Sequence, residues 1–131
     1  MTRSDINYLD YTWNPIKRKG GGYACTKVSE GCAHCWSSDY NRRFHKHGFD
    51  AMPIDFVLDE KELLAPLKIK KPSIIGVQFM SDLFHKDVWG QHLLSVFVVM
   101  TGDKLKHHQW LILTKRPDRM RDWIGDVVHI P

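Results

Sequence analysis

The second half of the chain constrains the fold most, because an apolar segment, a polar cluster and a segment of helical length occur there twice in succession. Residues 74–79 (IIGVQF) have the pattern of a strand that is buried on both faces, and residues 110–113 (WLIL) repeat it. Residues 86–100 and 117–123 follow as expected helices; the first is apolar almost all round, which predicts a well-buried helix. This alternation is typical of parallel βαβ units, since parallel neighbours need a crossover connection.

The first half of the chain predicts an earlier strand and two further helices. A short first strand is expected within residues 7–13 (NYLDYTW). Residues 33–47 (AHCWSSDYNRRFHKH) have the pattern of a helix, and a short helix is expected from Asp59 onward. Residues 49–58 are expected to connect these two helices. The sequence therefore predicts one α/β domain of parallel βαβ units.

Polar clusters follow each of the three predicted strands. A cysteine-rich loop follows the first, Ser81 and Asp82 follow the second, and residues 114–116 (TKR) follow the third. Parallel sheets place their ligand sites at the carboxyl ends of the strands, so we expect these three clusters to face one another at one edge of the sheet.

The three cysteines of the chain lie close together in the stretch ACTKVSEGCAHCW, with the spacing C-x6-C-x2-C. Small buried hydrophobic side chains are one interpretation, which the polar surroundings disfavour. A second is a tetrahedral zinc site with one histidine, His45 or His47, as the fourth ligand. A third is a 4Fe–4S cluster, in which three thiolates bind three irons and leave the fourth iron open. The cysteines are Cys25, Cys32 and Cys35.

Composition narrows the setting of this site. The net charge of +4 and the pI of about 9.0 permit contact with nucleic acid without requiring it. No apolar segment approaches the length of a membrane helix, and the polar N-terminus lacks the apolar core of a secretory signal. A cytoplasmic, reducing location is therefore expected, where clustered cysteines bind metal or do redox work more often than they form disulfides.

Four blocks of the sequence together resemble one known family. TWNP, CTKVSEGCAHCW, KKPSIIGVQFMSDLFHKDV and LILTKRPDRM resemble successive blocks of a phage-associated, largely uncharacterised family with a three-cysteine motif. That family is grouped with the radical S-adenosylmethionine (radical SAM) proteins, and the resemblance runs from about residue 11 to residue 120. It implies a partial radical-SAM-like (β/α) barrel that binds a 4Fe–4S cluster through Cys25, Cys32 and Cys35.

The resemblance also implies residues that contact a second cofactor. In radical SAM proteins the open iron is chelated by the methionine moiety of SAM, whose sulfonium is then cleaved by electron transfer. His34 stands where these enzymes commonly place an aromatic residue against the cofactor, and Ser81 and Asp82 follow the strand that contacts the methionine amino group. The cationic end of the third strand would hold the SAM carboxylate or a substrate phosphate. That strand end comprises Thr114, Lys115 and Arg116.

Two departures from the radical SAM pattern bear on function. The first cysteine gap is longer than the usual C-x3-C-x2-C, although the resembled family shares it. Three βα units cannot close a barrel, so residues 1–131 are expected to be a truncated, N-terminal part of a radical-SAM-like domain whose other half a partner chain would supply.

Two functions follow as hypotheses. One is a phage or prophage protein that binds a 4Fe–4S cluster and SAM and acts on nucleic acid; enzymatic activity of the 131-residue chain is left open. The alternative is a non-catalytic zinc module of Cys3His type that binds nucleic acid through a basic surface. The substrate and the electron donor do not follow from the sequence.

Overall fold

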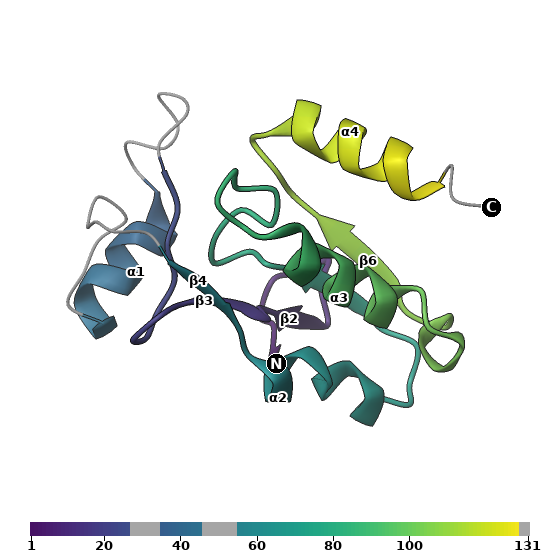
Figure 1. Ribbon diagram of the computed structural model, residues 1–131. Helices are drawn as coiled ribbons and strands as arrows, with labels where there is room; N and C mark the ends of the chain where they lie inside the picture. The colour runs from purple at the N-terminus through teal and green to yellow at the C-terminus, as the bar shows by residue number, and fades with distance from the viewer. Residues whose placement is uncertain (27–34, 46–54, 129–131) are drawn as a thin grey trace.

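The computed structural model describes residues 1–26, 35–45 and 55–128, which form an α/β fold around a mixed sheet (Figure 1). The four strands of this sheet lie in the order β1-β2-β5-β6. Strand β1 is antiparallel to β2, whereas β2, β5 and β6 are parallel to one another. The strands are β1 (Thr2–Arg3), β2 (Tyr11–Trp13), β5 (Ile74–Val77) and β6 (Gln109–Ile112).

The remaining elements connect these strands. Helix α3 joins β5 to its parallel neighbour β6, so that β5, α3 and β6 form a βαβ unit. A second, two-stranded antiparallel sheet pairs β3 with β4. These elements are β3 (Ile16–Arg18), α1 (Trp36–His45), β4 (Phe56–Leu58), α2 (Glu60–Leu63), α3 (Gly90–Met100) and α4 (Pro117–Val128), with 3-10 turns at Ala65–Lys68 and Asp103–Leu105.

The parallel strands and the helices agree with the sequence-based prediction, and three short strands do not. Strands β1, β3 and β4 have only two or three residues each; β4 lies in residues 49–58, which were expected to be a connection, and no strand was predicted at β1 or β3. Such short strands carry too few residues for a period-two pattern, and their pairing depends on neighbours far along the chain. Strand β3 also separates the cysteine segment from the first parallel strand, which it was expected to follow directly.

Helix α3 is less buried than the sequence predicts. The sequence predicts a well-buried helix over residues 86–100, but α3 begins at Gly90, and Leu93 and Val96 are its buried residues. Leu94 is 50% exposed and Val98 is 60% exposed. The helix covers the sheet with one face only, so the apolar side chains on its other face are accessible in the described part of the chain.

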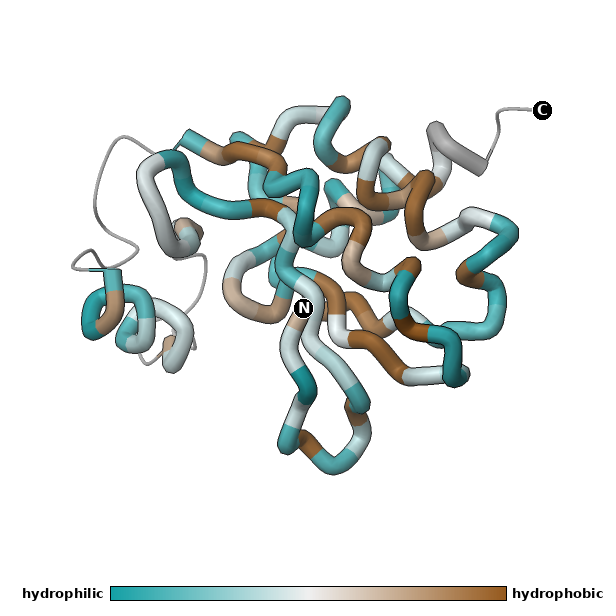
Figure 2. Tube along the Cα trace, turned by 90° about the horizontal axis from the view of Figure 1, so that it is seen from below, coloured by the Kyte–Doolittle hydropathy of each residue, from teal (hydrophilic) through white to brown (hydrophobic). Residues whose placement is uncertain are grey.

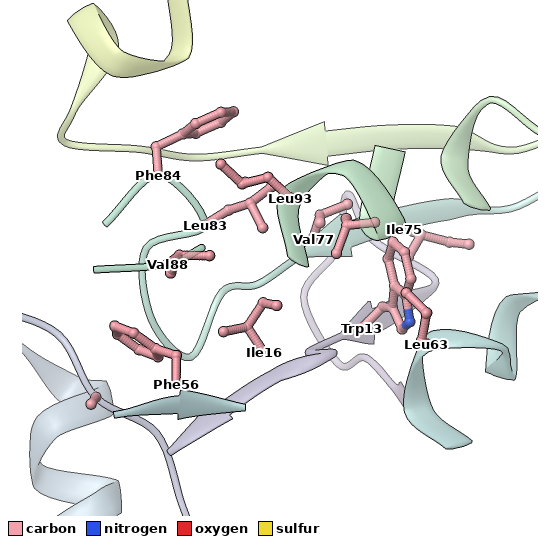
Figure 3. Close-up of a cluster of buried hydrophobic side chains, with 12 residues drawn as sticks. Trp13, Ile16, Phe56, Leu63, Ile75, Val77, Leu83, Phe84, Val88 and Leu93 are labelled. Carbon is pink, nitrogen blue, oxygen red and sulfur yellow. The ribbon is translucent and has the colours of Figure 1, made fainter. Parts of the chain in front are cut away.

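The core lies between the larger sheet, the β3–β4 sheet and the segment that follows β5 (Figure 3). Trp13 is fully buried in this core and donates from its indole nitrogen to the carbonyl oxygen of Glu62, at 2.7 Å. Figure 2 shows apolar segments running through the interior of the fold. No helix in residues 1–26, 35–45 and 55–128 is long and apolar enough to cross a membrane.

One buried glutamine sets the path of the chain at the end of β5. Gln78 is fully buried and has a positive φ of 56°, which is uncommon for a residue other than glycine. Its amide oxygen accepts from the backbone N–H of Ile16 at 3.0 Å, and its amide nitrogen donates to the carbonyl oxygen of Ile16 at 2.7 Å. The same nitrogen lies 2.8 Å from the hydroxyl of Ser81. Gln78 thereby fixes the start of β3 beside the polar segment after β5.

We expect Gln78→Leu to lower the free energy of unfolding by about 2–4 kcal/mol, because two buried backbone groups of Ile16 would lose their partner. Gln109→Leu is the matched control, since Gln109 is exposed, and its effect should stay within about 0.5 kcal/mol. Urea denaturation measures both. Equal stabilities for the two variants would show that Gln78 does not hold β3.

Candidate functional site

A cleft of about 580 Å³ lies at the carboxyl ends of β5 and β6. Because these strands are parallel neighbours, the segments that leave them emerge at the same edge of the sheet. Cys25, Thr26, Cys35 and the start of α1 also line it. Cys32, His34 and His47 lie outside the described residues. Of the other residues predicted from the sequence, His45 does not line this cleft, and the following do: Cys25, Cys35, Ser81, Asp82, Thr114, Lys115 and Arg116.

The carboxylate of Asp82 ties the two strand ends together. Asp82 is 6% exposed, and each of its oxygens accepts two hydrogen bonds. Oδ1 accepts from the backbone N–H of Phe84 at 3.0 Å and from the hydroxyl of Thr114 at 2.7 Å. Oδ2 accepts from the backbone N–H of Lys115 at 3.0 Å and from the guanidinium of Arg116 at 2.9 Å. These bonds occupy both carboxylate oxygens, so Asp82 serves here to position its neighbours.

Arg116 connects the Asp82 carboxylate to Cys25 and Thr26. Its Nη1 donates to Asp82 and lies 3.6 Å from the Sγ of Cys25. Its Nη2 donates to the carbonyl oxygen of Thr26 at 3.0 Å and to the hydroxyl of Thr26 at 2.9 Å. A planar guanidinium can make these bonds together because its donors point in fixed directions. Arg116 is thus the link between the end of β6 and the first cysteine.

His85 joins this hydrogen-bond network through the hydroxyl of Thr26. Its Nδ1 accepts from the backbone N–H of Asp87 at 3.0 Å, so the neutral ring carries its proton on Nε2 and donates to the hydroxyl of Thr26, also at 3.0 Å. The side chain is fully buried. Burial first, and the positive charge of Arg116 second, lower the pKa of His85 to about 4. The ring is therefore neutral at physiological pH.

The two described cysteines are free thiols with half-buried side chains, and both line the cleft. Burial raises the pKa of the Cys25 thiol, and the adjacent Arg116 opposes that rise. A metal ligand has to be a thiolate, so binding of a metal at Cys25 would release a proton. The guanidinium that already contacts Sγ would then face the resulting negative charge.

The donor set fits a sulfur-ligated group better than a carboxylate-ligated ion. Cys25 and Cys35 present sulfur to one cleft, while the oxygens of Asp82 are all hydrogen-bonded. Within the described residues no three His, Cys, Asp or Glu side chains form a metal-holding group, and the predicted third ligand, Cys32, is not among those residues. His45, a predicted zinc ligand, lies against Gly22 at the end of α1 and is not part of the cleft lining.

Sequence reasoning missed several residues that shape this cleft. Thr26 and His85 were overlooked because no local pattern marks their side chains as part of a site, and only the fold brings Thr26 within hydrogen-bond distance of both Arg116 and His85. Tyr8 and Trp36 also line the cleft. Trp36 directly follows the last cysteine, and this adjacency was the one available signal that it belongs to the site.

Fold and site together define an α/β protein with a cysteine-lined cleft at the carboxyl edge of parallel strands. The chain belongs to a family described as Protein of unknown function (DUF5131), whose model matches residues 3–130. Neither a curated protein nor a solved structure matched this chain.

We expect the fold to lose stability as the pH falls from 6.5 to about 4, the interval between the ordinary pKa of histidine and that of His85. Within this interval the unfolded chain binds a proton at His85 and the folded chain does not, so the free energy of unfolding decreases as the pH is lowered. The full contribution is about 3 kcal/mol at roughly 1.4 kcal/mol per pH unit. Above pH 6.5 this loss is absent.

Chemical denaturation of the wild type and of His85→Gln across this pH range measures the effect. The variant should be less stable than the wild type at neutral pH, because glutamine cannot reproduce both hydrogen bonds of the ring. Its stability should also depend less on pH. Parallel pH profiles for the two proteins would contradict the assignment to His85.

Proposed function

We propose that this chain is a radical-SAM-like protein of phage or prophage type, which binds a 4Fe–4S cluster through Cys25, Cys32 and Cys35 and binds SAM beside it. The observation that carries the proposal is that two free thiols and the polar ends of β5 and β6 line a single cleft. A bound cluster and SAM would supply reductive cleavage of the SAM sulfonium. Nucleic acid is the substrate class we propose, in keeping with the net charge of +4.

The size and lining of the cleft support the proposal. Its volume of about 580 Å³ lies within the range of about 300–1,000 Å³ that is usual for ligand pockets. Phe79, Met80 and Leu113 add apolar surface to the lining, which favours the exclusion of water around a bound cofactor. Ser81 lines the same cleft after β5, where its hydroxyl would orient a polar ligand, whereas the hydroxyl of Thr114 is engaged by Asp82 and by the backbone N–H of Arg116.

Arg116 is well placed to offset the negative charge of thiolate ligands. Its guanidinium touches the Sγ of Cys25 and is held there by Asp82. Hydrogen bonds to sulfur and nearby positive charge are two of the means by which proteins tune a cluster's reduction potential. In this proposal the ammonium group of Lys115, which is exposed and lines the cleft, contacts the carboxylate of SAM or a substrate phosphate.

We also propose that β2, β5 and β6 form the first strands of a radical-SAM-like (β/α) barrel. The support is that these three parallel strands lie side by side in the sheet in the same order as they occur along the chain. Helix α3 connects the last two. A partner chain that supplies further strands stays a prediction.

Anaerobic purification followed by reconstitution with iron and sulfide tests the proposal. We expect a brown protein with one 4Fe–4S cluster per chain, and we expect Cys35→Ser to lose most of the iron while its far-ultraviolet circular dichroism stays close to that of the wild type. His45→Ala is the matched control, because His45 is a candidate zinc ligand outside the cleft lining; its iron content should be unchanged. If the protein is instead colourless and binds zinc, and His45→Ala loses that zinc, then the site is a Cys3His zinc site and the cluster proposal is wrong.

A second test concerns Arg116. We expect Arg116→Gln to lower the reduction potential of the reconstituted cluster, because removing a positive charge next to Cys25 disfavours the added electron. Arg116→Lys, which keeps the charge, should lie closer to the wild type. A redox titration followed by electron paramagnetic resonance measures the potentials. Identical potentials for all three proteins would show that Arg116 acts on the fold and not on the cluster.

A further inference from the structure

Helix α1 (Trp36–His45) has the reverse of the polarity expected for a surface helix. Its buried residues are polar: Ser37, Ser38 and Asn41. Its exposed residues include three aromatic side chains four residues apart, which places them on one face of the helix. These are Trp36, Tyr40 and Phe44, with exposed fractions of 60%, 42% and 58%. We refer to these three residues as the aromatic stripe.

The buried face of α1 explains why the aromatic stripe faces outward. The hydroxyl of Ser37 donates to the carbonyl oxygen of Met80, and the amide oxygen of Asn41 accepts from the backbone N–H of Tyr23 at 2.8 Å. Polar hydrogen bonds, rather than apolar packing, therefore attach α1 to the body of the protein. Since the stripe takes no part in this attachment, its apolar surface is available to a ligand.

Positive charge accompanies the aromatic rings. Arg42 and Arg43 are both exposed on α1, and the guanidinium of Arg43 lies 5.2 Å from the ring centroid of Phe44. The rings of Tyr40 and Phe44 are 4.7 Å apart between centroids. Asp39 pairs with Arg42 at 3.4 Å, which leaves the helix surface with a net positive charge. The exposed apolar residues of α3, Leu94 and Val98, are aliphatic and have no arginine on their helix.

The stripe is continuous with the cleft. Trp36 lines the cleft and is also the first residue of the stripe, and Tyr8, which is 56% exposed, lines the cleft as well. Both Figure 1 and Figure 2 show α1 at the end of the molecule opposite the C-terminus. A linear ligand that lies along the outer face of α1 would therefore reach the mouth of the cleft.

We propose that the aromatic stripe binds single-stranded nucleic acid by stacking unpaired bases and leads the strand to the cleft. Every base has a π-face, so exposed aromatic rings beside arginines provide a sequence-tolerant platform, and arginines meet the phosphates. A duplex keeps its bases stacked inside and cannot use such a platform. The role of the bound strand as substrate rests on the proposed function above, whereas its binding to α1 does not require a cluster.

Fluorescence polarisation with a labelled oligothymidylate, the corresponding duplex and the full chain without iron tests this inference. We expect tighter binding of the single strand than of the duplex. Tyr40→Leu with Phe44→Leu should weaken single-strand binding by at least about tenfold, because leucine keeps the apolar surface and the helix but removes the π-faces. Trp89→Leu is the matched control: Trp89 is 65% exposed but does not line the cleft or belong to α1, and affinity should not change.

Arg42→Gln with Arg43→Gln should weaken binding and reduce its salt dependence, as expected when phosphate contacts are removed. Wild-type affinity in the Tyr40–Phe44 leucine variant, or equal affinity for single strand and duplex, would overturn the inference. So would the absence of oligonucleotide binding together with self-association that the leucine variant abolishes, since the stripe would then be a protein interface. If neither the wild type nor any variant binds iron, and Cys35→Ser still binds the oligonucleotide, then the single-strand inference holds and the proposed cluster is wrong.

Discussion

The buried carboxylate of Asp82 is the interaction on which the site depends. It accepts four hydrogen bonds from the ends of β5 and β6 and holds the guanidinium of Arg116 over Cys25 and Thr26. An arginine and an aspartate that are both largely buried are stable only when each keeps its partner, because either charge alone would be costly inside the protein. The strand ends, the charge pair and the first cysteine are therefore positioned as one unit.

The residues around the cleft have two different roles: some hold neighbouring side chains in place, and others present their side chains to the cleft. Asp82 and His85 have their polar atoms occupied by other parts of the chain, so their role in the structure is to hold Thr26 and Arg116 in place. The thiols of Cys25 and Cys35 line the cleft without a disulfide. Because the walls are held by hydrogen bonds and the two thiols form no disulfide, the proposal assigns the chemistry to the cysteines and the geometry to the strand ends.

Helix α1 extends from the cleft to the outer surface of the protein. Its polar face is turned inward and its aromatic face outward, and Trp36 belongs to both the cleft and the aromatic stripe. A binding surface that begins at the mouth of a cleft would bring a long ligand to the cysteines without enclosing all of it. That arrangement joins the proposed chemistry to the proposed single-stranded ligand, and each of the two can still be tested alone.

The sequence by itself determined the parallel strands, their order along the chain and the edge of the sheet at which the site lies, because buried strands such as residues 74–77 carry a local apolar pattern and their ends carry polar clusters. The spacing of the cysteines alone left buried side chains, a zinc site and an iron–sulfur cluster open, and the family resemblance favoured the cluster and added SAM. Only the tertiary structure decided that Asp82 accepts from four donors, that Thr26 bonds to both His85 and Arg116, and that α1 turns its aromatic side chains outward. Those features depend on contacts between residues far apart in the chain, and no local pattern of residue types encodes which partners will meet.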